Sequence, residues 1–94
     1  MASKTERRTP NNYAYGLLNV SHEVIGQGVE IARHYRETSI TSITPRTIAA
    51  SALYLACREN GHDFTQREIA HTFGLAEYTV REISGRINKS LRGG

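Results

Sequence analysis

The segment that most limits the fold is "PRTIAASALYLAC", which runs from Pro45 to Cys57. As a helix it carries apolar side chains on nearly every side, and such a helix is normally surrounded by other helices. Thr44 suits the N-cap, and Pro45 suits the first helical position, where its missing N–H costs no hydrogen bond. The apolar positions are Ile48, Ala49, Ala52, Leu53, Leu55, Ala56 and Cys57. The segment therefore predicts the central helix of an all-α bundle.

Two amphipathic segments before this helix are predicted to pack against it. Residues 22–37 repeat apolar residues at steps of three and four, after Ser21 as a suitable N-cap. The apolar positions are Ile25, Gly28, Val29, Ala32 and Tyr35. Residues 10–20, "PNNYAYGLLNV", indicate a shorter helix. With the two helices described next, the prediction is a five-helix bundle, and we find no pattern typical of a strand.

Residues 65–91 predict two further helices joined by a turn. Thr65 and Glu68 have the spacing of a capping box, which starts the first of these helices, and Gly74 ends it. A small residue in the first helix, a turn glycine and a β-branched residue in the second are typical of a helix-turn-helix. Ala70, Gly74 and Val80 supply the three. A purely structural helical hairpin is the alternative.

Charge and composition limit the classes of protein. The chain has 94 residues, which suits one domain, and its formal net charge of +3 permits nucleic-acid binding without requiring it. Two solvated basic ends would explain the charge equally well. No apolar run is long enough to span a bilayer, and the first residues lack the pattern of a secretory signal. With Cys57 as the single cysteine, we expect an intracellular protein without a disulfide or a cysteine zinc site.

The sequence carries no motif of an enzyme. The four histidines lack metal-ligand spacing, and there is neither a glycine-rich phosphate loop nor a nucleophile motif. The capping box explains Glu68, and Cys57 is expected to be a small core residue. We therefore expect no catalytic activity, no cofactor and no metal.

The long run "ITPRTIAASALYLACRENGHDFTQREIAHTFGLAEYTVREI" resembles the second cyclin-like repeat of the transcription factor IIB family, whose archaeal member is transcription factor B. The likeness is close over about residues 43–82 and looser over residues 10–42. It implies a five-helix bundle around its third helix, with the last two helices on promoter DNA beside the TATA box. It also implies TATA-binding protein as a partner, although the main docking surface for that partner lies on the family's other repeat. Tyr54 would be an interior aromatic.

The resemblance also assigns residues to DNA. Tyr78, Thr79 and Arg81 match the base-reading stretch of the family, at the start of a recognition helix placed in the major groove. Arg67 lies at the start of the preceding helix, where phosphates are contacted. Arg86 and Lys89 complete the expected DNA-binding set.

Two departures from the family limit this interpretation. The zinc ribbon of the full family protein is missing from this chain. RNA polymerase would therefore be contacted only through parts absent from it. The chain is then either an excised domain or a short divergent relative. After Arg81 the chain reads "EISGRINK" in place of a basic and aromatic segment. Gly85 in this stretch costs about 1 kcal/mol relative to alanine and is expected to weaken the last helix.

We expect a flexible lead at residues 1–9 and a single repeat at residues 10–91, with the helix-turn-helix within 65–91. The location would be the cytoplasm or nucleoid in an archaeon and the nucleus in a eukaryote. Two alternatives to a promoter-binding repeat remain. One is a protein-interaction module, because cyclin folds elsewhere bind peptides and kinases. The other is a stand-alone regulator, either a divergent one that does not read DNA or an ordinary helix-turn-helix protein without the cyclin fold.

Overall fold

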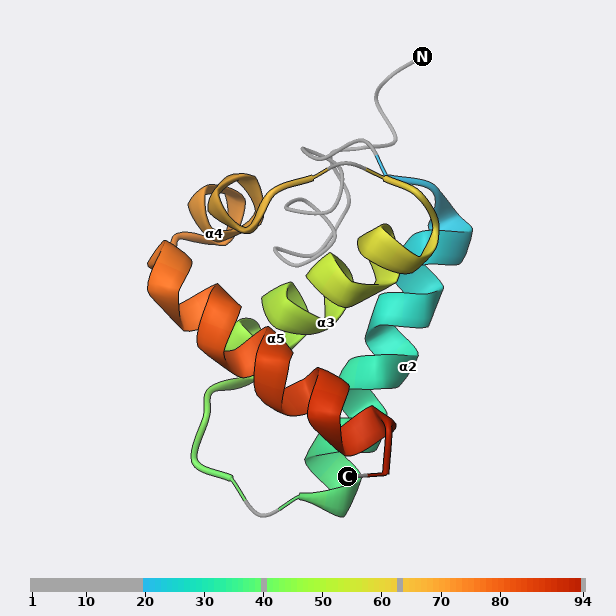
Figure 1. Ribbon diagram of the computed structural model, residues 1–94, viewed down its shortest axis with the longest axis vertical. Helices are drawn as coiled ribbons and strands as arrows, with labels where there is room; N and C mark the ends of the chain where they lie inside the picture. Colours follow the sequence, from blue (N-terminus) through green and yellow to red (C-terminus); the bar gives the residue numbers. More distant parts are fainter. Residues whose placement is uncertain (1–19, 40, 63, 94) are drawn as a thin grey trace, which may run out of the picture.

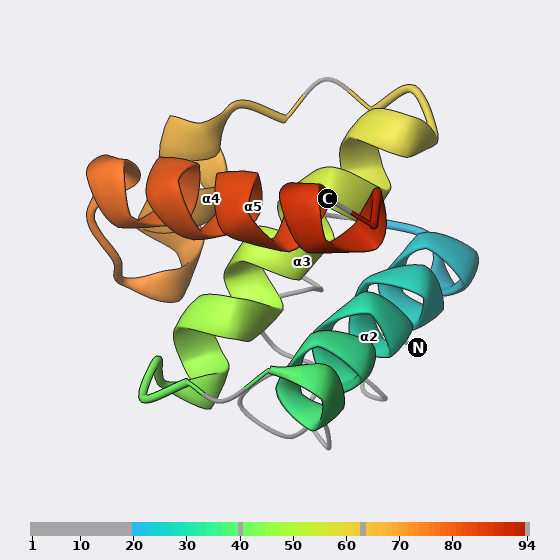
Figure 2. The same cartoon turned by 60° about the horizontal axis from the view of Figure 1, so that its bottom comes forward.

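The computed structural model describes residues 20–39, 41–62 and 64–93. These residues form four α-helices and no strand: α2 (His22–Thr38), α3 (Pro45–Glu59), α4 (Gln66–Phe73) and α5 (Glu77–Leu91). Helices α2, α4 and α5 all pack against α3, and α4 also packs against α5 (Figure 1). Viewed from a second direction, α4 still lies on the far side of the molecule from α2 (Figure 2). The predicted short helix within residues 10–20 lies outside the described residues.

Helix α3 is the predicted central helix. Its N-cap Thr44 accepts a hydrogen bond from the Thr47 amide, and Pro45 is its first residue. Helices α2, α4 and α5 cover α3, and its fully buried side chains are Ile48, Ala50, Ser51, Ala52, Leu53, Ala56 and Cys57. The prediction of an interior Tyr54 is wrong in part, because Tyr54 is only half-buried. The guanidinium carbon of Arg58 lies 5.7 Å from the centre of the Tyr54 ring.

Helix α2 begins after Ser21, whose hydroxyl accepts a hydrogen bond from the Val24 amide. One prediction for its apolar face is wrong: Val29 is 45% exposed, whereas Val24 is only 3% exposed and belongs to the core. Val24 and Gly28 are four residues apart and share the face that meets α3, while Val29 is turned about 100° from Gly28. A Cβ at Gly28 would lie 3.2 Å from the Leu53 Cα, so this glycine permits a close approach of the two helices.

The end of α3 and the start of α4 follow local signals. Gly61 has a φ of 78° after the end of α3, a left-handed conformation that favours glycine. Thr65 and Glu68 form the complete capping box: the Thr65 amide donates to the Glu68 carboxylate at 2.9 Å, and the Glu68 amide donates to the Thr65 hydroxyl at 3.0 Å. None of the described helices is both long enough and apolar enough to cross a membrane.

Helix α5 continues through Gly85 to Leu91 without interruption, although the glycine was expected to weaken it. Its inner face packs into a cluster that joins α5 to α2 and α3. The members of this cluster are Tyr35, Ile48, Leu55, Ile83 and Ile87. Burial of Ile83 and Ile87 on both sides of Gly85 offsets the low helix propensity of glycine, because most helix stability in proteins comes from packing of the apolar face.

Candidate nucleic-acid interface

Helices α4 and α5 are joined by the short segment Gly74, Leu75 and Ala76. Gly74 adopts a left-handed conformation with a φ of 71°, and the Leu75 amide donates to the Ala70 carbonyl at 2.8 Å. Ala70 and Val80 are both buried in the same core cluster. The turn glycine thus ends α4, and the small and β-branched residues lie in the core between α4 and α5.

One face of α5 points away from the core and has the exposed Glu82 at its edge. This face carries Tyr78, Arg81, Gly85 and Lys89. These four residues, named the α5 outer face below, follow at steps of three, four and four positions, so they fall within an arc of about 80° around the helix. All four are exposed. The buried side chains Val80, Ile83 and Ile87 lie on the opposite side of the helix.

Two of the side chains predicted to read bases contact each other. The guanidinium carbon of Arg81 lies 5.4 Å from the centre of the Tyr78 ring, and Tyr78 is 61% exposed. A cation over an aromatic face gains electrostatic attraction, which favours one orientation of the guanidinium. The third predicted side chain, Thr79, is half-buried and lies about 100° round the helix from Tyr78.

The remaining predicted residues are distributed over two helices. Arg86 is exposed on the same flank of α5 as Thr79, rather than on the α5 outer face. Arg67 is exposed near the start of α4, where it lines an open pocket of about 850 Å³ together with His71 and Glu77. The described structure therefore brings Tyr78, Arg81 and Lys89 onto one surface and places Thr79, Arg86 and Arg67 beside it.

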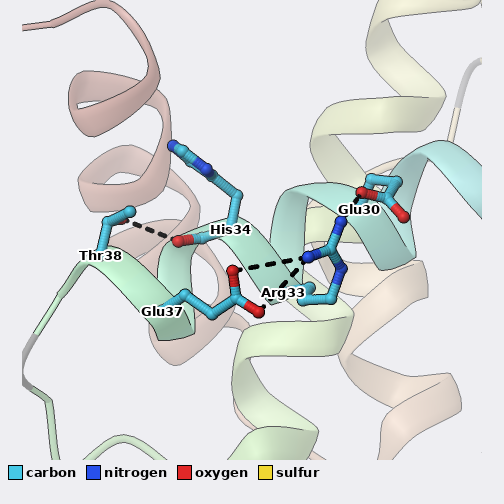
Figure 3. Close-up of polar contacts among 5 residues, drawn as sticks. All are labelled: Glu30, Arg33, His34, Glu37 and Thr38. Atoms are coloured by element: carbon cyan, nitrogen blue, oxygen red, sulfur yellow. Dashed lines mark hydrogen bonds and ion pairs between the residues drawn. The ribbon is translucent and has the colours of Figure 1, made fainter.

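Within the described part of the chain, no ion pair involves a cation of α5. Helix α2 differs, because Arg33 forms ion pairs with both Glu30 and Glu37 (Figure 3). Hydrogen bonding to Glu30 and the charge of that carboxylate are the largest effects raising the pKa of Arg33, and Glu37 adds to them. The positive charge of Arg33 is thus balanced within its own helix, whereas the charges of Arg81 and Lys89 face solvent.

Sequence reasoning missed Arg46 as a neighbour of this surface. Arg46 belongs to the first turn of α3, yet one of its guanidinium nitrogens lies 3.8 Å from the position that a Cβ on Gly74 would occupy. A cation of the central helix therefore lies beside the turn between α4 and α5. Only the packing of α3 against the last two helices creates this proximity, so no local sequence signal could have indicated it.

Among the residues that the structure describes, no three or more histidine, cysteine or acidic side chains are grouped so that they could hold a metal ion. Cys57 lies fully buried in α3, and burial raises the pKa of its thiol to about 11. A buried, protonated thiol is a poor nucleophile and a poor metal ligand.

Comparison with known proteins identifies the family of the chain. The model of the transcription factor TFIIB repeat matches residues 13–89. The chain belongs to the TFIIB repeat family. Its all-helical architecture is consistent with the cyclin-like fold of such a repeat.

Relatives with the same family name occur in archaea. A transcription initiation factor IIB of Aeropyrum pernix is 32% identical over 88 residues, which cover 89% of this chain and 27% of that protein. A transcription initiation factor IIB of Methanosarcina mazei is 42% identical over 65 residues, which cover 68% of this chain and 19% of that protein. The chain thus spans about a fifth to a quarter of the length of these relatives. No solved structure matches the TFIIB repeat of this chain significantly.

Proposed function

We propose that this TFIIB repeat binds promoter DNA in transcription initiation, with α4 and α5 as a helix-turn-helix and α5 as the recognition helix. The observation that carries the proposal is the α5 outer face, where Arg81 and Lys89 are exposed, outside any ion pair among the described residues, and accompanied by an exposed aromatic ring. Unpaired cations on one helix face match the phosphate charge of a duplex, and an α-helix fits the major groove. The relatives are named transcription initiation factors, which supports the same role.

Each residue has a separate part in this proposal. Arg81 would make two hydrogen bonds to a guanine edge, the commonest specific contact in the major groove. Tyr78 would hold the Arg81 guanidinium in place. Lys89 would meet a phosphate, and Arg67 would do the same from the start of α4. Such contacts add affinity without sequence preference.

The two residues on the flank of α5 have a lesser part. Thr79 and Arg86 would face the wall of the groove, because both are turned away from the α5 outer face. The half-buried Thr79 has little side chain available, so Arg86 would contribute the larger share of the contact.

The wider context is also a proposal. We infer that residues 10–91 form one five-helix repeat, that residues 1–9 are a flexible lead, and that TATA-binding protein on the same DNA increases the affinity. A lone repeat with few phosphate contacts would bind DNA weakly by itself. This role implies an intracellular location, and contact with RNA polymerase would require parts outside this chain.

Fluorescence anisotropy tests the proposal, with a promoter duplex and a scrambled duplex titrated over a range of salt concentrations, with and without TATA-binding protein. We expect Arg81→Ala to remove about 1–3 kcal/mol of the preference for the promoter duplex. Lys89→Ala should weaken binding to both duplexes equally and reduce the slope of log K against log salt by about 0.9.

The charge-matched control is Arg33→Gln, which removes one positive charge from α2 and should leave the promoter preference unchanged. The DNA-binding proposal fails if the wild-type chain binds neither duplex in a salt-dependent way, whether TATA-binding protein is present or absent. The protein-interaction module would then be the better account of the exposed α5 face.

A further inference from the structure

Gly85 lies at the centre of the α5 outer face, and nothing in the described structure requires a glycine there. A Cβ at Gly85 would meet no heavy atom within 4 Å, and the residue lies within continuous helix. Gly28 and Gly74 differ, because Gly28 adjoins the backbone of Leu53 and Gly74 has a positive φ. Alanine at position 85 would favour the helix by about 1 kcal/mol. The fold therefore does not explain this glycine. Either it serves an interaction with another molecule, or it has no role.

The neighbours of Gly85 distinguish these two possibilities. Arg81 lies four residues before it and Lys89 four residues after it, so both cations flank the bare backbone on the same face. The exposed Glu82 lies three residues before it, so the two cations outnumber one carboxylate around Gly85. At a rise of 1.5 Å per residue, the two cations are attached about 12 Å apart along the helix axis. Gly26 in α2 is equally open, but its neighbours four residues away are His22 and Glu30. Of the two open glycines within the described helices, Gly26 and Gly85, only Gly85 has positive charge four residues away on both sides.

We propose that one sugar-phosphate strand of duplex DNA crosses α5 at Gly85 and rests directly against the helix backbone. Glycine is the residue that permits such a close approach of backbone to a ligand. Arg81, nearer the start of α5, then lies on one side of this strand and reaches into the groove. Lys89 lies on the other side of the strand and contacts its phosphates. This inference rests on the proposed function and adds where the DNA strand lies and why the helix accepts a destabilising residue.

The test adds side chains at Gly85 and at the matched position Gly26. Alanine and leucine both favour helix, so all four variants (Gly85→Ala, Gly85→Leu, Gly26→Ala and Gly26→Leu) should unfold at or above the wild-type temperature. A side chain at Gly85 would separate the strand from the helix, as overpacking does in a close-packed interior. We expect the Kd for duplex DNA to rise a few-fold in Gly85→Ala and about tenfold or more in Gly85→Leu. The two Gly26 variants should bind like wild type.

Two outcomes distinguish failure of this inference from failure of the proposed function. If wild type binds duplex DNA in a salt-dependent way and Gly85→Leu binds it as tightly, the inference is wrong while the proposed function stands. The inference is also wrong if the Gly26 variants weaken binding as much as the Gly85 variants. If wild type binds no duplex, both fail. Thermal unfolding of each variant, followed by circular dichroism, confirms that a loss of binding is not a loss of fold.

Discussion

Gly28 sets how closely α2 and α3 approach each other. An added Cβ would lie 3.2 Å from the Leu53 Cα, a backbone atom that cannot move without shifting the helix. We expect Gly28→Ala to lower the free energy of unfolding by about 1–3 kcal/mol through overpacking. Gly26→Ala, in the same helix but facing open space, should raise it by about 0.5–1 kcal/mol. Urea denaturation of both variants would measure the difference, and equal stability would show that the helices do not pack closely at Gly28.

Cys57 gives a second prediction at the scale of one residue, concerning pH. Burial raises the pKa of its thiol from 9.0 to about 11, so the folded state holds its proton at a pH where the unfolded chain loses it. The stabilisation by the protonated thiol is complete below pH 9.0 and is lost as the pH rises towards 11. Cys57→Ala leaves a cavity and should be less stable than wild type at neutral pH.

We expect that difference in stability to shrink as the pH rises from 9.0 to about 11. Urea denaturation of wild type and Cys57→Ala at several pH values would measure it. The comparison cancels the titration of the tyrosines, which both chains share. A difference that stays constant across this range would show that the thiol is not buried in the core.

At the scale of one element, α4 depends on its cap. It has only eight residues, and isolated helices of that length are marginal in water. The capping box satisfies two amides at its start. Thr65→Ala should therefore lower the free energy of unfolding by about 1 kcal/mol, whereas Thr65→Ser keeps the hydroxyl and should lose much less. Urea denaturation would compare them, and an equal loss in both variants would argue against the cap.

Helix ends could be predicted from sequence because their causes are local. Thr44, Thr65 and Gly74 act on amides or torsion angles within a few residues of themselves, and each does in the structure what the sequence indicated. Burial that depends on how helices pack was harder to predict from the sequence. The sequence could not distinguish Val24 from Val29, because which side of α2 meets α3 depends on the crossing of the two helices.

The same limit applies to the candidate site. The succession of Tyr78, Arg81 and Lys89 along one helix face follows from helical periodicity, so the sequence located that surface. Arg46 comes from a different helix and reaches the turn at Gly74 only through tertiary packing. Thr79 was predicted to be available to DNA and is half-buried, because its position lies between the outer and inner faces of α5.

At the scale of the whole molecule, Arg33 in α2 differs from the cations on the α5 outer face in how its charge is balanced. In α2, Arg33 is bound to carboxylates on both sides along its own helix (Figure 3). In α5, Arg81 and Lys89 lie on an exposed face outside any ion pair among the described residues. A polyanion would therefore be attracted to α5 and not to the Arg33 side of α2, because paired charges largely cancel beyond a few ångströms.

The most direct test of DNA binding through α5 is an NMR titration of the isotope-labelled chain with a promoter duplex at low salt, followed through the backbone amides. We expect the largest shifts at Arg81, Gly85 and Lys89 and in the turn at Gly74, while the amides around Arg33 stay unchanged. Raising the salt concentration should reverse the shifts. Shifts concentrated around Arg33, or no shifts with any duplex, would contradict the assignment of α5 as the DNA-binding helix.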